Sequence, residues 1–243
     1  MKSTASLRQR GFTLIETVIA IGVIAVLLTG FMMVFAPAAA GIRKALNVQE
    51  ADRLASTLEQ ELVTLRGPSS ATMQTGFAKA FEWIRESNTV GEAILVYQYR
   101  GRFSKALRPD GTPEPEPNIK DQLPGKDYVL QTMARRKSDP KFLEDLKAVE
   151  GGVYLVKCTQ LVFSKGQLTP GTAGSIVDPK GTSGTGGNVA SADVYPEAVI
   201  AFSADFFALP ARTASFFGSG GGFDKTFTAV KKPVFTRNLA VRR

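Results

Sequence analysis

The chain contains 243 residues, 44% of them hydrophobic, which is enough for one domain of ordinary size with an appended segment. Its formal charge is +8, but the first eleven residues hold three basic and no acidic side chains. The remaining 27 basic and 22 acidic residues give only +5, which does not predict nucleic-acid binding. The lack of histidine removes the usual residue for proton transfer and metal binding, and the single cysteine, Cys158, excludes an intramolecular disulfide.

A long apolar stretch from Phe12 to Ala36 predicts a membrane-spanning helix. Its 25 residues form a helix of ~37 Å, longer than the ~30 Å hydrocarbon layer. The basic residues before it favour a cytoplasmic start and a single-pass protein whose carboxy-terminal head lies outside the cytoplasm. Alternatively, the small residues APAAA at 36–40 resemble a signal cleavage site, and cleavage after Ala40 would release a soluble domain.

Glu16 is the only charged residue of this stretch, and neither an ordinary anchor nor an ordinary signal explains it. A carboxylate within a membrane segment costs about 2–3 kcal/mol. It therefore needs either a partner of opposite charge or access to the lipid headgroups. Access to the headgroups is possible, because Glu16 lies only ~6 Å along the helix from Phe12.

The residues Arg10-Gly-Phe-Thr-Leu-Ile-Glu16 resemble the processing site of type IV prepilins and pseudopilins. The shared features are a short basic leader, a glycine, an aromatic first mature residue and a glutamate fifth after the cut. The resemblance implies cleavage by a prepilin peptidase between Gly11 and Phe12 and N-methylation of Phe12. It also implies that Glu16 pairs with the amino-terminal ammonium of a neighbouring pilin or pseudopilin subunit, and that the protein resides in the inner membrane, a pilus or the cell surface.

An amphipathic pattern follows the apolar stretch and predicts that the helix continues to about Arg66. Arg66-Gly67-Pro68 supplies a basic last turn, a glycine cap and a proline stop. The helix can break at Gly30 or near Pro37, and the first proline stands further along than in many pilin-like proteins. We expect one stripe to pack on the protein's own head, comprising Ile42, Leu46, Leu54, Leu58, Leu62 and Leu65.

Beyond residue 67 the pattern predicts an α+β head, in which an antiparallel β-sheet packs on the second half of the long helix. Pilin-like proteins share this plan. Helices are expected at residues 78–84 and from Asp139 to about Val149. Strands are expected at residues 92–99, 127–134, 153–163, 197–209 and 234–241.

Two segments, 108–127 and 164–193, read as long loops. The first contains the prolines of PEPEP at 113–117 and is expected to be an extended surface loop. The second has seven glycines in thirty residues; its GTSGTG at 181–186 begins like a phosphate-binding loop but lacks the required lysine. Asp178, Asn188 and Asp193 are weak candidates for calcium ligands, because their spacing follows no known pattern.

Phenylalanine is concentrated near the carboxyl end, where eight of sixteen lie between Phe202 and Phe235. Adjacent residues of a strand point to opposite faces, so one member of the pairs Phe206-Phe207 and Phe216-Phe217 is expected to be exposed unless a second layer covers it. An exposed member would indicate contact with a partner. Cys158 is expected to be a buried, inert thiol within a strand.

Together these patterns predict a structural subunit of a type IV pilus-like or type II secretion pseudopilus filament, with no enzyme activity, cofactor, metal or small-molecule substrate. The expected parts are a leader at 1–11, a membrane and filament-core helix at 12–36, an amphipathic second half at 37–66 and a head at 67–243. The alternative is an anchored or secreted binding module that recognises a ligand through residues 164–193 or the phenylalanine-rich end.

Overall fold

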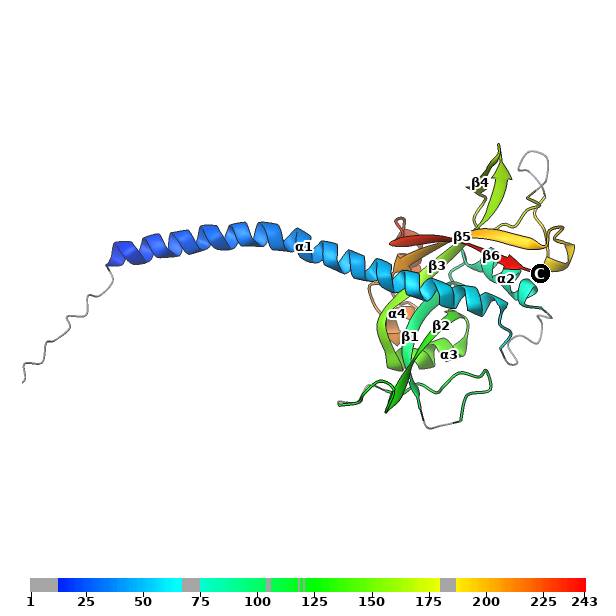
Figure 1. Ribbon diagram of the computed structural model, residues 1–243, viewed down its shortest axis with the longest axis horizontal. Helices are drawn as coiled ribbons and strands as arrows, with labels where there is room; N and C mark the ends of the chain where they lie inside the picture. Colours follow the sequence, from blue (N-terminus) through cyan, green and yellow to red (C-terminus); the bar gives the residue numbers. More distant parts are fainter. Residues whose placement is uncertain (1–12, 67–74, 104–105, 118, 120, 180–186) are drawn as a thin grey trace, which may run out of the picture. The chain divides into compact units, whose positions relative to one another are not determined.

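A computed structural model describes residues 13–66, 75–103, 106–117, 119, 121–179 and 187–243. The chain divides into two compact units, residues 1–46 and residues 47–243, and we call the second unit the head. Helix α1, Leu14–Val63, contributes residues to both units (Figure 1). Pro37 lies inside this helix without ending it, so the break considered at Gly30 or Pro37 is not observed.

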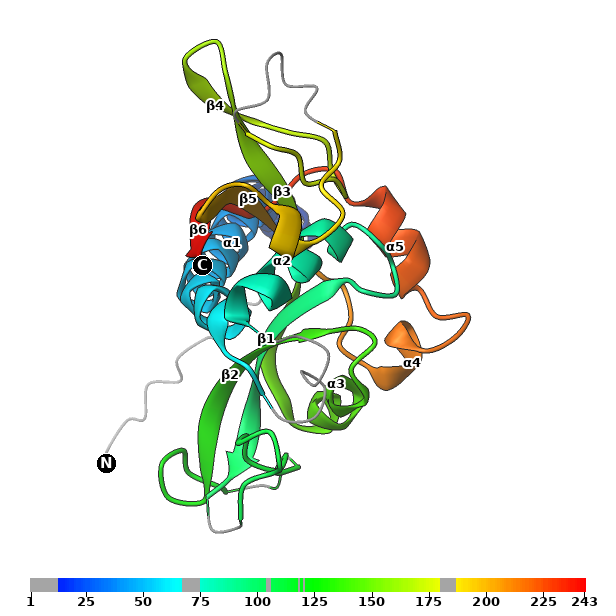
Figure 2. The same ribbon diagram turned by 90° about the vertical axis from the view of Figure 1, so that its right-hand side faces the viewer.

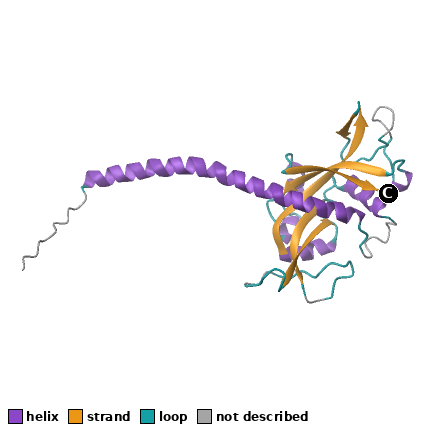
Figure 3. Cartoon of the chain, in the orientation of Figure 1, coloured by secondary structure: helices purple, strands orange, loops and turns teal. Residues whose placement is uncertain are grey.

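The head is α+β, as predicted (Figure 3). Its helices are α2 (Gly76–Glu86), α3 (Pro140–Asp145), α4 (Ala214–Phe217) and α5 (Phe223–Ala229). Its strands are β1 (Ile94–Arg102), β2 (Tyr128–Arg136), β3 (Val149–Ser164), β4 (Gln167–Pro170), β5 (Val199–Ala208) and β6 (Phe235–Arg242). The five expected strands correspond to β1, β2, β3, β5 and β6. The helix expected to reach Val149 is shorter, because β3 already begins there.

The strands form one antiparallel sheet in the order β2-β1-β3-β5-β6, and β4 pairs with the far end of β3. The register places Tyr97 of β1 opposite Met133 of β2, and Cys158 of β3 opposite Ala204 of β5. β4 lies within the glycine-rich stretch that was expected to be a loop. Lys165 and Gly166, both with positive φ, form the two-residue turn that allows this hairpin.

One face of the sheet packs on α2 and on the part of α1 that belongs to the head. The stripe prediction is correct for Leu54, Leu58 and Leu62, which are fully buried against β1, β3 and β5. It is wrong for the other three residues, Ile42, Leu46 and Leu65, which are exposed. Cys158 is buried in this layer, and burial raises the pKa of its thiol to about 12.

A second layer covers the other face of the sheet, and the sequence pattern did not predict it. Figure 2 shows α3, α4 and α5 beside the sheet. Phe142, Phe217 and Phe223 of these helices pack with the buried residues of this face. Phe206 is therefore buried on the first face and its neighbour Phe207 on the second. The motive for a partner disappears at Phe206-Phe207, because both members are buried within the chain. Of the other pair, Phe217 is buried, whereas Phe216 is half-buried and packs on Phe217 and Phe223.

The carboxyl end of α1 is fixed to the head by a buried lysine. α1 ends at Val63, three residues earlier than expected. The Lys79 ammonium of α2 donates to the carbonyls of Glu61 (2.6 Å) and Thr64 (2.7 Å) and pairs with the Glu61 carboxylate (2.8 Å). Burial lowers the pKa of Lys79, and the Glu61 carboxylate partly opposes this. Carbonyls at a helix end that lack intrahelical partners are thereby satisfied.

The proline-rich loop pairs with the sheet rather than running free in solvent. The Arg102 N–H donates to the Glu114 carbonyl (2.8 Å), and the Glu116 N–H donates to the Arg100 carbonyl (2.7 Å). Glu116 supplies the N–H of these bonds and Glu114 the carbonyl, so the missing proline donors are not needed. A side chain at Gly101 would collide with the Pro113 ring, which explains the glycine at this position.

Asp145 is the centre of a buried ionic network. Its carboxylate, fully buried, accepts hydrogen bonds from Tyr97 Oη (2.7 Å), Arg135 Nε (3.0 Å) and Arg108 Nη1 (2.7 Å). Arg135 also pairs with Asp110 at 3.0 Å. Burial would raise the pKa of Asp110, but hydrogen bonds, including one from Arg135, outweigh burial and hold this pKa well below its usual range. The network joins β1, β2, α3 and the start of the proline-rich loop.

We expect Asp145→Asn to lower the free energy of unfolding of the head by about 3–5 kcal/mol, because it leaves two buried guanidiniums without their shared carboxylate. The matched control is Asp224→Asn, which removes an exposed pair with Lys137 (3.0 Å) and costs about 0–1 kcal/mol. Urea unfolding of the full chain in detergent, followed by fluorescence of the only tryptophan, Trp83, measures both. Equal effects of the two substitutions would contradict the assignment.

Candidate processing and assembly site

Glu16 lies in the first turn of α1, where Thr13 caps the helix. Thr13 donates to Glu16 Oε2 through both its backbone N–H and its hydroxyl, each at 2.9 Å. In return the Glu16 N–H donates to Thr13 Oγ1 at 3.3 Å. This reciprocal arrangement is a capping box, and it satisfies donors that a helix start leaves without intrahelical partners. The sequence signal of this cap is a threonine three residues before a glutamate, and the prediction for Glu16 did not include it.

The cap leaves part of the Glu16 carboxylate available. Its two bonds from Thr13 both reach Oε2, and no described residue donates a hydrogen bond to Oε1. The other hydroxyls of the stretch are satisfied inside the helix: Thr17 Oγ1 donates to the Thr13 carbonyl (3.2 Å) and Thr29 Oγ1 to the Ala25 carbonyl (2.8 Å). Glu16 is therefore the side chain of this described stretch that still requires a charged partner.

The apolar part of α1 is uncovered along its length. Every described side chain from Leu14 to Leu46 is exposed, with Leu14 at 86% and Met33 at 74%. Of the described helices, α1 is the one that is long and apolar enough to cross a membrane. A helix that is apolar on all sides is stable only where lipid or other helices surround it.

Gly11 and Phe12 lie outside the described residues, so the structure places only Glu16 of the three candidate residues. The phosphate-loop-like segment 181–186 also lies outside them. Asn188 lies beside Val177, and its Oδ1 accepts a hydrogen bond from Ser175 Oγ at 2.8 Å. Among the described residues, no cluster of three or more histidine, cysteine or acidic side chains suits a metal ion.

A cavity of about 250 Å³ lies in the head beside Trp83 and Arg135. Its charged groups are largely engaged in ion pairs: Lys79 with Glu61 (2.8 Å) and Arg135 with Asp110 (3.0 Å). Ion pairs of this kind stabilise the fold and do not form a nucleophile with an adjacent base. The cavity therefore provides no catalytic arrangement.

The amino-terminal region matches a known family profile. Residues 6–32 match the prokaryotic N-terminal methylation motif. This match includes the beginning of α1, with Glu16, and most of the exposed apolar stretch. No curated protein and no solved structure gives a significant match to the chain.

The motif and the apolar helix are the signature of one class of protein. The chain carries the signature of prepilin-like proteins, which prepilin peptidase processes and which assemble with other pilin-type subunits. The match covers residues 6–32 only, and the α+β head is compatible with the pilin-like plan. Proteins with this motif are structural subunits rather than enzymes, and the apolar helix fits a single-pass membrane anchor.

We expect Thr13→Val to loosen the first turn of α1, because the methyl group that replaces the hydroxyl can neither accept from the Glu16 N–H nor donate to its carboxylate. Loss of such a cap costs about 1 kcal/mol, so the Glu16 amide should exchange its hydrogen about five-fold faster. Thr13→Ser, which keeps the hydroxyl, is the control. Amide exchange by NMR in detergent micelles measures both, and an unchanged rate in Thr13→Val would argue against the cap.

Proposed function

We propose that this chain is a structural subunit of a type IV pilus-like or type II secretion pseudopilus filament, assembled through α1. The observation that carries the proposal is the methylation motif at 6–32 joined to a helix whose described side chains from Leu14 to Leu46 are all exposed. Lipid covers these side chains in the monomer, and neighbouring helices replace lipid in the filament. The transfer keeps the apolar surface out of water at each stage.

Processing supplies the charge that Glu16 requires. We propose that prepilin peptidase cuts between Gly11 and Phe12 and that the new amino group of Phe12 is methylated. An α-amino group has a reference pKa of about 7.7–8.0, so it is mostly protonated at neutral pH, and a methylated amine keeps its charge. Either charge alone is costly among apolar helices, whereas the pair can be buried together and fixes the axial position of each subunit.

The proposed parts follow from this function. Residues 1–11 are the leader, 12–36 the anchor and filament core, 37–66 the second half of the helix, and 67–243 the part of the head beyond the helix, which lies outside the cytoplasm. The mature chain from Phe12 has 232 residues, that is 243 less 11. Its size and its two long loops favour a minor pilin or a pseudopilin over a major pilin.

The proposed processing predicts where the protein begins in native membranes. We expect the chain to begin at Phe12 and to carry one added methyl group, because the peptidase must act before assembly. Intact mass and amino-terminal sequencing measure this directly. A start at Gly41 would indicate a secreted domain, and an uncut Met1 would indicate a plain anchor; either result would overturn the proposal.

The proposed role of Glu16 predicts that Glu16→Ala separates membrane insertion from filament assembly. We expect this variant to insert into the membrane as well as the wild type or slightly better, since an apolar residue replaces a carboxylate that costs about 2–3 kcal/mol. It should nevertheless fail to enter filaments, because the neighbour's ammonium loses its partner. Membrane fractionation measures insertion, and the yield of sheared filaments measures assembly.

Glu59→Ala is the matched control, because Glu59 is an exposed glutamate on the same helix but within the head. It should leave both insertion and assembly unchanged. Normal filament yield from Glu16→Ala would mean that Glu16 does not guide assembly.

A further inference from the structure

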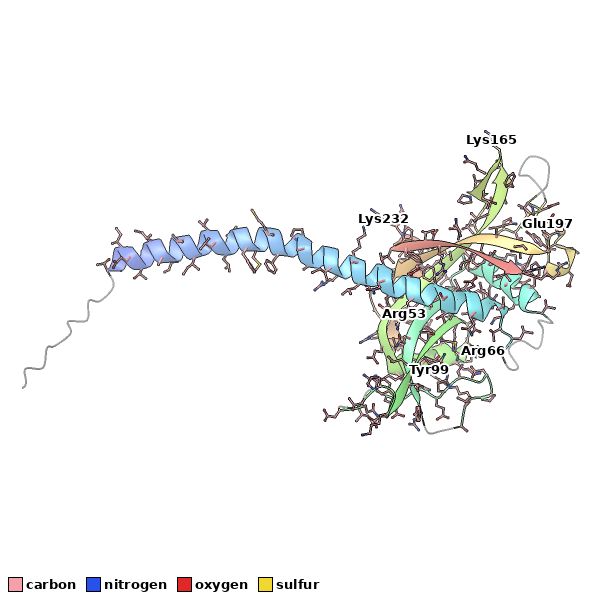
Figure 4. The ribbon with its side chains drawn as sticks, in the orientation of Figure 1. Arg53, Arg66, Tyr99, Lys165, Glu197 and Lys232 are labelled. Atoms are coloured by element: carbon pink, nitrogen blue, oxygen red, sulfur yellow. The ribbon has the colours of Figure 1, made fainter. Side chains whose placement is uncertain are left out.

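The hairpin of β3 and β4 carries two exposed apolar side chains at its end. We define the hairpin tip as residues 163–168. Phe163 and Leu168 are direct cross-strand partners, and 61% and 57% of their surfaces are exposed. The turn residue Lys165 marks this tip in Figure 4. A cross-strand pair of this kind is stabilising when covered, yet here only solvent faces it.

A second group of exposed apolar side chains lies where β1 and β2 are joined. We define the loop end as the described residues between 103 and 130. Hydrogen bonds fix part of this end. Tyr99, labelled in Figure 4, donates from its Oη to the Pro113 carbonyl at 2.8 Å. Glu114 and Glu116 form backbone hydrogen bonds with β1. The exposed large apolar residues of the loop end are Phe103, Leu107, Ile119, Leu123 and Leu130.

Strand pairing puts the hairpin tip and the loop end at opposite ends of the sheet. Tyr99, near the end of β1, lies opposite Val149, the first residue of β3. β1 continues from there to Arg102 and the loop end. β3 runs the other way for the rest of its 16 residues to the hairpin tip. Figures 1 and 2 both place the β4 hairpin and the loops between β1 and β2 at opposite ends of the head.

The two ends differ in charge. Lys165 is the only charged residue between 159 and 177, which gives +1. Residues 103–130 contain four basic and five acidic residues, which gives 4 − 5 = −1, and Asp121 and Asp127 are exposed. The difference is small, so apolar contact supplies the attraction and the charges favour one orientation over its reverse.

We propose that the hairpin tip of one copy of this chain docks on the loop end of the next copy. A single chain that carries two complementary surfaces at opposite ends forms a heterologous contact, which repeats and does not close into a dimer. The proposal rests on the proposed filament function and adds the contact made by the heads.

This contact is weak by itself. A six-residue hairpin tip offers much less surface than the ~800 Å² per partner of a standard stable interface. Packing of α1 against its neighbours holds the heads at high local concentration, and under that condition a weak contact becomes occupied. The head contact therefore sets orientation, whereas the helices supply most of the association free energy.

The test uses cysteine cross-linking of the full chain in native membranes. Phe163→Cys and Leu123→Cys are introduced into one chain, and an oxidant is added. The two positions lie at opposite ends of the head, so a disulfide between them joins two copies and generates a ladder of dimers, trimers and longer species. Cys158 remains in all variants because it is buried, and the wild type controls for it.

Four further variants define the contact. Phe163→Cys alone should give no cross-link, because copies of the same residue do not meet in a heterologous contact. Phe163→Cys with Ser219→Cys, an exposed position outside the loop end, should give no ladder. Lys165→Glu in the double-cysteine chain should reduce the ladder several-fold, and Lys165→Glu with Asp121→Lys should restore it.

Co-purification of two differently tagged copies separates this inference from the proposed function. Co-purification together with the ladder supports both. Co-purification without the ladder overturns the head contact and leaves the filament subunit in place. If neither co-purification nor the ladder is observed, both proposals are overturned. A dimer from Phe163→Cys alone, or a cross-link to a protein of different mass, would overturn the assignment of the loop end of a second copy as the partner.

Discussion

A helix that leaves its whole apolar circumference uncovered must be surrounded by something other than water, and the rest of this structure follows from that requirement. Every described side chain from Leu14 to Leu46 is exposed, and Phe31 stacks on Phe35 of the same helix. The same helix becomes amphipathic after Leu46, and its buried leucines form part of the core of the head. Helix α1 therefore has one part that packs in the head and one apolar part whose side chains are exposed. The methylation motif lies at the exposed end.

The role proposed for Glu16 follows from the same need of α1 for apolar surroundings. In an apolar setting the hydroxyls of Thr17 and Thr29 are satisfied by carbonyls of the previous turn. Thr13 occupies one carboxylate oxygen of Glu16, and the charge itself remains without an opposite charge among the described residues. A cation from another chain would remove this deficit, and the amino group created by processing would be such a cation. Cleavage and assembly are then linked by electrostatics.

Local patterns in the sequence predicted the parts of this protein whose environment is simple. The apolar stretch, the leucines Leu54, Leu58 and Leu62, and five strands were recognisable because periodicity reports one buried face. The patterns failed where tertiary contacts decide. Phe207 is buried because α4 and α5 return to the second face of the sheet, and no local pattern predicts that return. The proline-rich loop pairs with β1 because β3 begins only at Val149 and leaves that edge of β1 open.

Coverage of both sheet faces limits where the head can make contacts. α1 and α2 cover one face, and α3, α4 and α5 cover the other. The outer strands β2 and β6 are poor docking sites, since β2 ends in the partly exposed Arg136 and β6 carries Arg237 and Arg242. Charged side chains on an edge discourage strand addition. The ends of the strands remain, and the exposed apolar residues of the hairpin tip and the loop end lie there. A head built in this way can associate with another copy end to end without uncovering its core.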